Sequence, residues 1–424
     1  MKFLHAADIH LDSPLQNIAL DSPEEADRLR RATREAFEAL VDLALAEEVR
    51  FLLLAGDLYD HDTPNMQIAL FLRNQLLRLA RANIRVVIVR GNHDAANKIT
   101  SALDLPGNTT VLSSRSPQTV EFPEWEVAIT GQSFTEGPVT TNLARGYPEP
   151  RPGRFNIAML HTSLQGSEEH DVYAPCTLAD LTFRPYQYWA LGHIHKGAIL
   201  SRDPYVVYPG NLQGRHARET GPKGAMLVEF EVSRVLGLEF RPLDVVRWHQ
   251  VAVDLTGRGT RHELAEALRT GLSRAILESE GRPAIVRLLL SGESSLASEL
   301  ARSPESLRQT VLELAGELAG DLASGGLWIE KIKNATTLPA KKSKRAALPD
   351  DDLRAILEEI VRDPSSLAAP LEKELSPLAA KLPEDLREPV ERLLGQGEDL
   401  PEDLSRLFAS LLPRLESRLY PSED

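Results

Sequence analysis

The sequence predicts an α/β protein: a layered α/β sandwich, followed by a small α/β module and a helical C-terminal region. Three observations support this prediction. Short apolar runs alternate with amphipathic helical stretches in the first part of the chain, which is typical of a largely parallel sheet covered by helices. Shorter strands broken by glycine and proline follow. The last part combines helical periodicity with repeated prolines.

The sandwich is predicted from residues 1–245. Apolar side chains recur every three to four positions over 23–48 and 64–82, the spacing of one helix face, and these helices lie between strand-like apolar runs. From 107 to 160 the strands become shorter, as expected for the second half of a sandwich. We expect the runs at 205–210 and 224–232 to continue that second sheet.

The character of the chain changes near 244–250. Strand, helix, strand, helix and strand patterns follow one another and predict a small α/β domain over 246–336 without ligand-type residues at its strand ends. Residues 337–349 form a basic, proline-bounded linker. Residues 350–424 contain narrow amphipathic stretches punctuated by prolines, which indicates a helical region that packs on a partner or on the body of the protein.

Composition fits a soluble cytoplasmic protein. The single cysteine, Cys176, excludes an internal disulfide and fits a reducing compartment. No apolar run approaches the roughly 18 residues of a membrane span, and the N-terminus leads directly into a strand. Residues 348–424 hold 9 Lys and Arg against 19 Asp and Glu, so they carry −10 of the net charge of −14. The remaining −4 leaves room for a locally positive channel that binds a phosphate backbone.

Polar residues of metal-ligand type end five of the apolar runs. They are Asp8, His10, Asp57, Asn92, His93, His161, His193 and His195. Strand ends meet at one edge of a sheet, so these residues can converge on one pocket. Their mixed nitrogen and oxygen donors suit Mn²⁺, Fe²⁺ or Zn²⁺ better than Ca²⁺. Residues two apart in extended backbone point to the same face, so Asp8 with His10, and His193 with His195, can each serve one site.

This ordered set resembles the calcineurin-like metallophosphoesterases and, among them, the DNA-repair exonucleases of the SbcD type. The resemblance covers residues 1–245 strongly and 246–335 in outline, as the DNA-capping domain of that family. The stretches EEHDVYAPCTL, YWALGHIHK and YPGNLQGRHARETGPKG are also similar to a YhaO-like bacterial branch. The resemblance implies a metal-dependent nuclease with a two-domain body.

The resemblance also implies individual roles. Asp57 would bridge two divalent ions, Mn²⁺ or alternatively Fe²⁺ or Zn²⁺. His93 would stabilise the transition state and protonate the leaving oxygen, with Asp94 orienting it. Two ions about 3.5–4 Å apart can activate a hydroxide and hold the phosphate in line with its leaving group. The remaining ligands divide between the two ions: Asp8, His10 and His195 on the first, and Asn92, His161 and His193 on the second.

A basic stretch after the last of these strands offers candidate phosphate contacts. Arg215, His216 and Arg218 lie in the YhaO-like segment and could hold the DNA backbone. A solvated loop is an equally open interpretation of the same residues.

Three functions fit the sequence. The first is a Mn²⁺-dependent DNA exonuclease and endonuclease, the nuclease subunit of an SMC-like, ABC-type ATPase complex in double-strand-break repair. For this function the SbcD resemblance implies a homodimer. The second is a phosphodiesterase of cyclic nucleotides or other small diesters on the same metal core. The third is a scaffold with a vestigial metal site. The module at 246–336 argues against the second, and the complete set of seven ligands argues against the third.

Overall fold

A computed structural model describes residues 1–13, 15, 23–60, 66–96, 104–135, 139–164, 173–320 and 326–339. The chain divides into two compact units. One comprises Met1–Val251, Arg269–Leu288 and Val311–Ile332, and the other comprises Ala252–Leu268, Leu289–Thr310 and Lys333–Asp424. Most of the predicted linker and the whole predicted helical region, from residue 340 on, lie outside the described residues. No helix among the described residues has the length and apolarity needed to cross a bilayer.

The first sheet has six strands in the order β12-β11-β1-β2-β3-β4. Its centre is parallel, since β1 pairs with β2, β2 with β3 and β3 with β4 in the same direction. The antiparallel pair β11 and β12 extends it beyond β1. The bounds are β1 Lys2–Ala6, β2 Phe51–Ala55, β3 Arg85–Val89, β4 Thr109–Val111, β11 Gly224–Glu231 and β12 Arg234–Pro242.

The second sheet also has six strands, in the order β5-β6-β7-β8-β10-β9. Strands β6, β7, β8 and β10 run parallel, with an antiparallel strand at each edge. The bounds are β5 Gln118–Phe122, β6 Val127–Gly131, β7 Phe155–His161, β8 Tyr188–Gly192, β9 Ala198–Arg202 and β10 Tyr205–Tyr208. Short helices lie in the connections: α3 Asn92–Ala96, α5 Leu178–Thr182 and the 3₁₀ turns Pro123–Trp125 and Ala144–Gly146.

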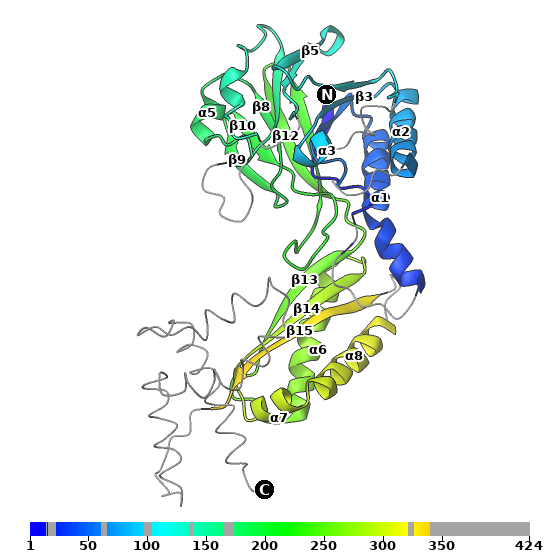
Figure 1. Ribbon diagram of the computed structural model, residues 1–424, viewed down its shortest axis with the longest axis vertical. Coiled ribbons are helices and arrows are strands. Elements are labelled where there is room, and N and C mark those ends of the chain that lie inside the picture. The colour runs from blue at the N-terminus through cyan, green and yellow to red at the C-terminus, as the bar shows by residue number, and fades with distance from the viewer. Residues whose placement is uncertain are drawn as a thin grey trace, which may run out of the picture. The chain divides into compact units, whose positions relative to one another are not determined.

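The layers follow from the alternation of apolar side chains along each strand. On β1, Leu4 and Ala6 pack with the apolar stripe of helices α1 (Pro23–Ala46) and α2 (Met66–Arg81). The neighbouring Phe3 belongs instead to the core between the two sheets. Figure 1 shows α1 and α2 side by side on one face of the sheet that contains β3. A third cluster, around Trp189, covers the outer face of the second sheet.

Two strands belong to a different sheet from the one that the sequence predicts. The run at 224–232 forms β11 and pairs antiparallel with β1, for example Phe3 with Val228, so it extends the first sheet. The short strand β4 also joins the first sheet, beside β3. Most of β11 is buried, so its sequence resembles a central strand of either sheet and does not indicate its neighbour. The edge strands β5, β9 and β12 do not stand out in the sequence, because they lack a continuous apolar run.

The predicted small α/β module contains a three-stranded sheet in the order β13-β14-β15 with three helices. The first of several boundaries between the compact units falls within β13, after Val251. The bounds are β13 Arg247–Asp254, α6 Arg261–Glu278, β14 Ala284–Glu293, α7 Ala297–Arg302, α8 Pro304–Gly320 and β15 Leu327–Thr337.

Candidate metal centre

Residues of metal-ligand type follow five strands, three in the first sheet and two in the second. They are Asp8 and His10 after β1, Asp57 after β2, Asn92 and His93 after β3, His161 at the end of β7, and His193 and His195 after β8. Strands β1, β2 and β3 are parallel neighbours, as are β7 and β8. Their carboxyl ends therefore lie at one edge of each sheet, which is where α/β proteins place their sites.

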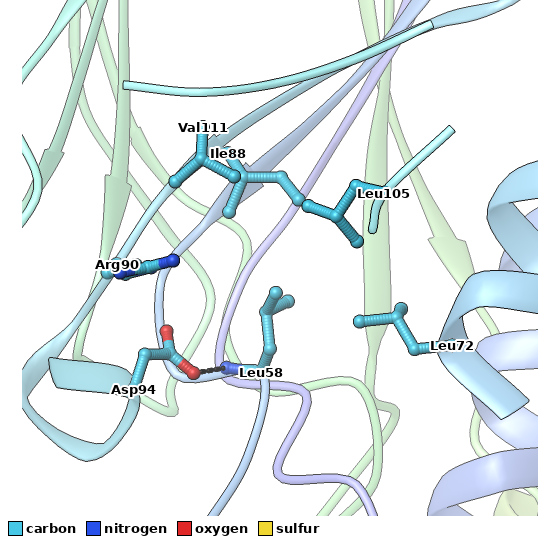
Figure 2. A pocket seen from close by; sticks show the side chains of 7 residues that line it. All are labelled: Leu58, Leu72, Ile88, Arg90, Asp94, Leu105 and Val111. Atoms are coloured by element: carbon cyan, nitrogen blue, oxygen red, sulfur yellow. Dashed lines mark hydrogen bonds between the residues drawn. The ribbon is translucent and has the colours of Figure 1, made fainter. Parts of the chain in front are cut away.

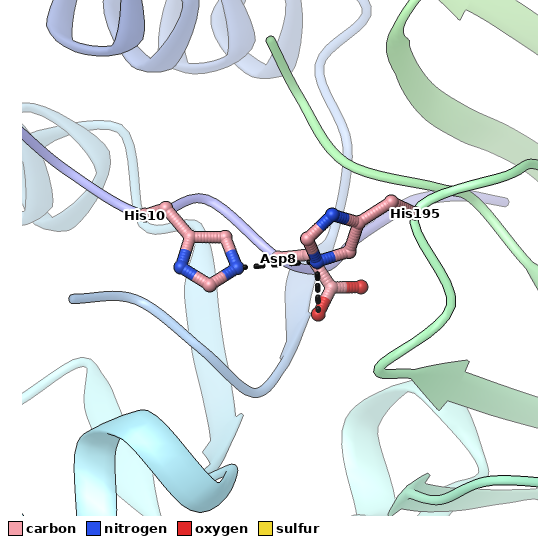
Figure 3. A group of neighbouring side chains, drawn as sticks. All are labelled: Asp8, His10 and His195. Carbon is pink, nitrogen blue, oxygen red and sulfur yellow. Dashed lines mark hydrogen bonds and ion pairs between the residues drawn. The ribbon is translucent and has the colours of Figure 1, made fainter. Parts of the chain in front are cut away.

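The first group consists of Asp8, His10 and His195, whose ligand-type atoms all lie within 4.8 Å of one another. His195 Nε2 lies 3.3 Å from His10 Nε2 and 3.9 Å from an oxygen of Asp8. Figure 3 shows His10 and Asp8 on the segment that follows β1, with His195 reaching them from the segment that follows β8. Two facing imidazole nitrogens beside a buried carboxylate can hold a divalent cation.

The second group consists of Asp57, His161 and His193, again within 4.8 Å. His161 Nε2 lies 3.3 Å from Asp57 Oδ2 and 3.1 Å from Asn92 Oδ1. All three members of this group are buried, and Asn92 is partly buried. Ligand-type atoms of three residues therefore lie in a small volume, with a neutral amide oxygen beside His161.

Asp57 lies between the two groups. Its Oδ2 is 3.3 Å from His161 Nε2 in the second group and 3.9 Å from His10 Nε2 in the first. Its other oxygen accepts a hydrogen bond of 3.0 Å from the backbone N–H of His93. A carboxylate in this position lies close to ligand-type nitrogens of both groups, as a bridging ligand requires.

The backbone at these residues differs from the expected extended form. Asp8, His10, Asp57 and His193 have φ values of 52°, 47°, 53° and 97°, in the left-handed region that non-glycine residues rarely adopt. The expectation that His193 and His195 serve one site by strand alternation is therefore wrong. His193 belongs to the Asp57 group and His195 to the Asp8 group, because the chain turns between them.

Three glycines allow this close approach, and each one directly precedes a ligand-type residue. A Cβ on Gly91 would lie 2.8 Å from two ring atoms of His161 and even closer to Asp57 Oδ1. A Cβ on Gly56 would meet the ring of His161, and one on Gly192 would meet the carbonyl of Ala55. The Gly-Asp, Gly-Asn and Gly-His pairs in the sequence thus reflect a site with no space for side chains at these positions.

The outward nitrogens of three imidazoles are held by acceptors around the groups. His10 Nδ1 lies 2.6 Å from Asp60 Oδ1, and His195 Nδ1 lies 2.5 Å from Glu219 Oε1. His161 Nδ1 donates to the carbonyl of Ala55 at 2.9 Å. When Nδ1 donates outward, Nε2 faces inward and is the nitrogen left to bind a metal once the ring is neutral.

His93 and Asp94 lie beside the two groups but face different surroundings. His93 Nε2 is 4.0 Å from Asp57 Oδ2, and His93 Nδ1 is 3.6 Å from Asp60 Oδ1. The Asp94 carboxylate instead accepts hydrogen bonds from the backbone N–H groups of Leu58, Tyr59 and Gly91. Figure 2 shows Asp94 bonded to Leu58 beside a small, mostly apolar cavity. None of these bonds joins Asp94 to His93, so they do not support the expected orienting role of Asp94. The carboxylate near His93 Nδ1 is that of Asp60.

The three candidate phosphate contacts behave differently from one another. Arg215 donates from Nη1 to both Asp60 oxygens at 3.2 Å and to the Ser13 hydroxyl at 3.0 Å, so one nitrogen of its guanidinium is held inside the protein. His216 is partly buried, with Nε2 3.5 Å from Glu219. Arg218 is exposed and remains a candidate for a DNA contact.

Comparison with known proteins agrees with this geometry. The model of the calcineurin-like phosphoesterase family matches residues 1–197, and that of the middle domain of metallophosphoesterase YhaO matches residues 248–337. YhaO of Bacillus subtilis, an uncharacterised metallophosphoesterase, is 38% identical over 297 residues, covering 69% of this chain and 72% of its own. The chain belongs to the YhaO-type calcineurin-like metallophosphoesterases. It is therefore a metal-dependent phosphodiesterase.

Relatives of this metallophosphoesterase include DNA-processing proteins. The DNA double-strand break repair protein Mre11 of Methanopyrus kandleri is 27% identical over 401 residues, covering 85% of this chain and 82% of its own. The SbcD component of the nuclease SbcCD of Escherichia coli is 25% identical over 250 residues, covering 50% of this chain and 60% of its own.

Burial and neighbouring charges act against each other in this phosphoesterase centre. Burial acts to raise the pKa of Asp57, but the adjacent His161 holds that pKa well below its usual range. Burial acts to lower the pKa of His161, yet the Asp57 carboxylate raises it to about 9. Burial raises the pKa of Asp8 to about 6. Asp57 therefore stays anionic, and His161 must release a proton before its Nε2 can bind a cation.

Two residues contact the histidines of this centre although the sequence predicts no role for either of them. Asp60 follows Asp57 by three positions and touches both His10 and His93. Glu219 is buried against His195 although 24 residues separate them. Asp60 follows the Gly-Asp turn so closely that the sequence places it on a loop facing the substrate, but it assigns Asp60 no catalytic step. Glu219 lies in a loop with ordinary polar composition, and only the fold brings it to His195.

Proposed function

We propose that this phosphoesterase is a DNA exonuclease and endonuclease that uses two Mn²⁺ ions. The observation that carries the proposal is the extent of the similarity to Mre11, which covers 85% of this chain and so continues well past the phosphoesterase match at 1–197. An enzyme of small diesters needs no second module. Residues 246–336 are then a DNA-capping domain, and the metal-bearing residues 1–245 are the nuclease domain.

The donor set fits two divalent ions that share Asp57. Buried carboxylates and imidazoles, with their Nε2 atoms turned inward, offer hard and borderline donors of the kind that Mn²⁺ and Fe²⁺ accept. Once bound, the ions would supply Lewis acidity to the phosphodiester and a nucleophile at neutral pH. In this proposal Asp8, His10 and His195 hold one ion, Asn92, His161 and His193 hold the other, and Asp57 bridges them.

His93 is the proposed general acid of the reaction. Its side chain is 31% exposed, against 16% for His195 and 1% or less for His10 and His161, so among these four imidazoles it is the most accessible to a substrate. Its Nε2 faces the Asp57 region and can deliver a proton to the leaving oxygen. Asp60, 3.6 Å from His93 Nδ1, orients the ring in the role first expected of Asp94.

Degradation of labelled linear duplex DNA in Mn²⁺ tests the proposal. The wild-type protein should release nucleotides or short fragments, and an Asp57→Ala variant should not. Cyclic nucleotides and a chromogenic small diester serve as the competing substrates in parallel reactions. Efficient hydrolysis of the small diesters without cleavage or binding of DNA would favour the second candidate function and refute the nuclease.

Partners are part of the same proposal. The names of the relatives describe a break-repair protein and one component of a two-part nuclease. We propose DNA as substrate, an SMC-like ATPase as partner, and a homodimer in the cytoplasm. Co-purification of an SMC-like ATPase with this protein from the cells that produce it tests the partner. Analytical sedimentation of the purified chain measures its mass in solution and so tests the dimer.

A further inference from the structure

Glu219 is a buried carboxylate that contacts the proposed metal centre from outside. It is 7% exposed and lies in a loop, residues 211–223, which we call the support loop. We propose that Glu219 is a positioning residue for His195 and that the support loop ties it to strand β13. The inference rests on the proposed metal centre.

The contacts of Glu219 account for both of its oxygens. Oε1 lies 2.5 Å from His195 Nδ1. Oε2 accepts hydrogen bonds from Asn211 Nδ2 at 3.0 Å and from the backbone N–H of Arg215 at 2.7 Å. Because Nδ1 is the outward nitrogen of the ring, the carboxylate does not compete for the ion. It holds the ring so that Nε2 faces Asp8 and His10.

The support loop also holds the backbone of His195. Lys223, which is buried, donates from Nζ to the carbonyl oxygen of His195 at 2.9 Å. The backbone N–H of Asn211 donates to the same carbonyl at 3.3 Å. One loop thus fixes the ring through a carboxylate and the main chain through an ammonium and an amide. The position of His195 therefore depends on the position of this loop.

Strand β13 and the residues just before it hold the support loop in turn. Trp248 donates from its indole to the carbonyl of Gly214 at 2.9 Å, and Gln250 donates to the carbonyl of Ala217 at 2.6 Å. Gln213 bonds back to the backbone of 245 and 246. A Cβ on Gly214 would lie 2.9 Å from the Trp248 ring, so the packing there is close. These contacts all lie within Met1–Val251, and β13 then continues into the second compact unit.

The alternation of side chains on β13 supplies an internal control. Trp248 and Gln250 point to the support loop, whereas His249 between them points to the other face. There His249 Nε2 lies 2.8 Å from the Ser279 hydroxyl, which is also buried. Ser279→Ala therefore removes a buried hydrogen bond of β13 without touching the support loop. It should lower stability and leave metal binding unchanged.

Titration of the metal-free full-length protein with Mn²⁺, followed by the electron paramagnetic resonance of free Mn²⁺, tests Glu219. Glu219→Gln keeps the shape of the side chain but replaces one carboxylate oxygen with an NH₂ group. In one orientation this group faces His195 Nδ1, and in the other it faces the N–H donors of Asn211 and Arg215, so one set of hydrogen bonds is lost. One of the two binding events should weaken about 10–100-fold, the usual effect of losing such a support. The other event should stay unchanged. Two unaltered events would overturn the role of Glu219.

Trp248→Phe tests the tie to β13, because it removes the indole N–H and keeps most of the ring. The Mn²⁺-binding event that Glu219→Gln weakens should also weaken in Trp248→Phe, by a smaller factor. Ser279→Ala should leave this event unchanged, even if it lowers the melting temperature as much as Trp248→Phe does or more. If Trp248→Phe and Ser279→Ala both only lower the melting temperature, the tie is wrong. Wild-type protein that binds two Mn²⁺ ions but cleaves no DNA would refute the nuclease proposal alone. Wild-type protein that binds no Mn²⁺ would overturn both.

Discussion

At the scale of single residues, the centre combines donors with opposite needs. Asp57 is buried and still anionic, since His161 lies 3.3 Å away and lowers its pKa against the effect of burial. An unpaired buried carboxylate would lower the stability of the fold. Protonated imidazoles compensate its charge while no cation is bound, and a bound cation would take over this role. The same side chains can therefore exchange a proton for a divalent ion without leaving a buried charge unpaired.

Asp57→Asn should abolish metal-dependent cleavage with little loss of fold. The amide keeps the volume and can still accept the hydrogen bond from the His93 N–H, but it is neutral and cannot bridge two cations. Mn²⁺ affinity should fall by more than the roughly 10–100-fold expected when an outer hydrogen-bond partner is lost. Circular dichroism checks the fold, and Mn²⁺ titration with a DNA cleavage assay checks the site. Wild-type activity at modest Mn²⁺ would refute the bridging assignment.

His93→Gln should separate chemistry from binding. His93 Nε2 lies 4.0 Å from Asp57 Oδ2 but its side chain is far more exposed than the His10 and His161 rings, so a role on the substrate predicts that both ions remain bound. Turnover should fall by about 10²–10⁴, the usual contribution of a positioned acid. Single-turnover cleavage, Mn²⁺ titration and DNA binding are measured on the same preparation. Parallel loss of one ion would make His93 a ligand instead.

At the scale of elements, the long helices and the buried strands are predictable from the sequence, whereas the edge strands and the sheet membership are not. Helices at 23–48 and 64–82 follow from a single apolar face, and the structure has α1 and α2 there. Strand β11 is predicted in the wrong sheet because its pairing with β1 spans more than 200 residues and leaves no local signal.

The division of the metal-ligand residues into two groups is also hard to predict from the sequence. Residue types at strand ends predict that they converge, but left-handed turns, such as that at His193, decide which group each side chain joins.

The turn after β3 offers a test at this scale. Gly91→Ala should weaken Mn²⁺ binding and cleavage, because its Cβ would lie against Asp57 and 2.8 Å from the His161 ring. Gly107→Ala is the matched control, since a Cβ there meets no atom within 4 Å. Both variants are compared by Mn²⁺ titration and thermal melting. Equal metal affinity in the two proteins would show that the close packing at Gly91 is not needed for the site.

At the scale of the whole molecule, the change in sequence character near 244–250 coincides with the start of β13, the first of several elements in which the chain changes from one compact unit to the other. The first unit ends its longest segment at Val251, within β13, and the YhaO middle-domain match begins at 248. The predicted boundary at 245 remains a proposal. The support loop shows why a sharp boundary is hard to read from sequence: Trp248 and Gln250 belong to β13 but bond to Gly214 and Ala217 of the preceding phosphoesterase part.

Removal of residues 348–424 should leave the phosphoesterase folded and separate it from its proposed partner. This segment carries −10 of the net charge of −14, and its amphipathic stretches are split by prolines. Helices as short as the predicted ones would bury too little apolar surface to be stable alone, so we expect them to need a surface on which to dock. An ATPase coiled coil is the proposed surface.

The truncated protein and the full chain are compared in two assays. Mn²⁺-dependent cleavage of short single-stranded DNA should survive the truncation, because all seven proposed ligands lie between residues 8 and 195. ATP-stimulated cleavage and co-purification with the ATPase should be lost. Deletion of 340–347 alone, which removes the basic run but keeps the acidic segment, serves as the control and should retain the partner. If the truncated protein aggregates or no longer binds Mn²⁺, the segment belongs to the folded body, and the proposed linker at 337–349 is misplaced.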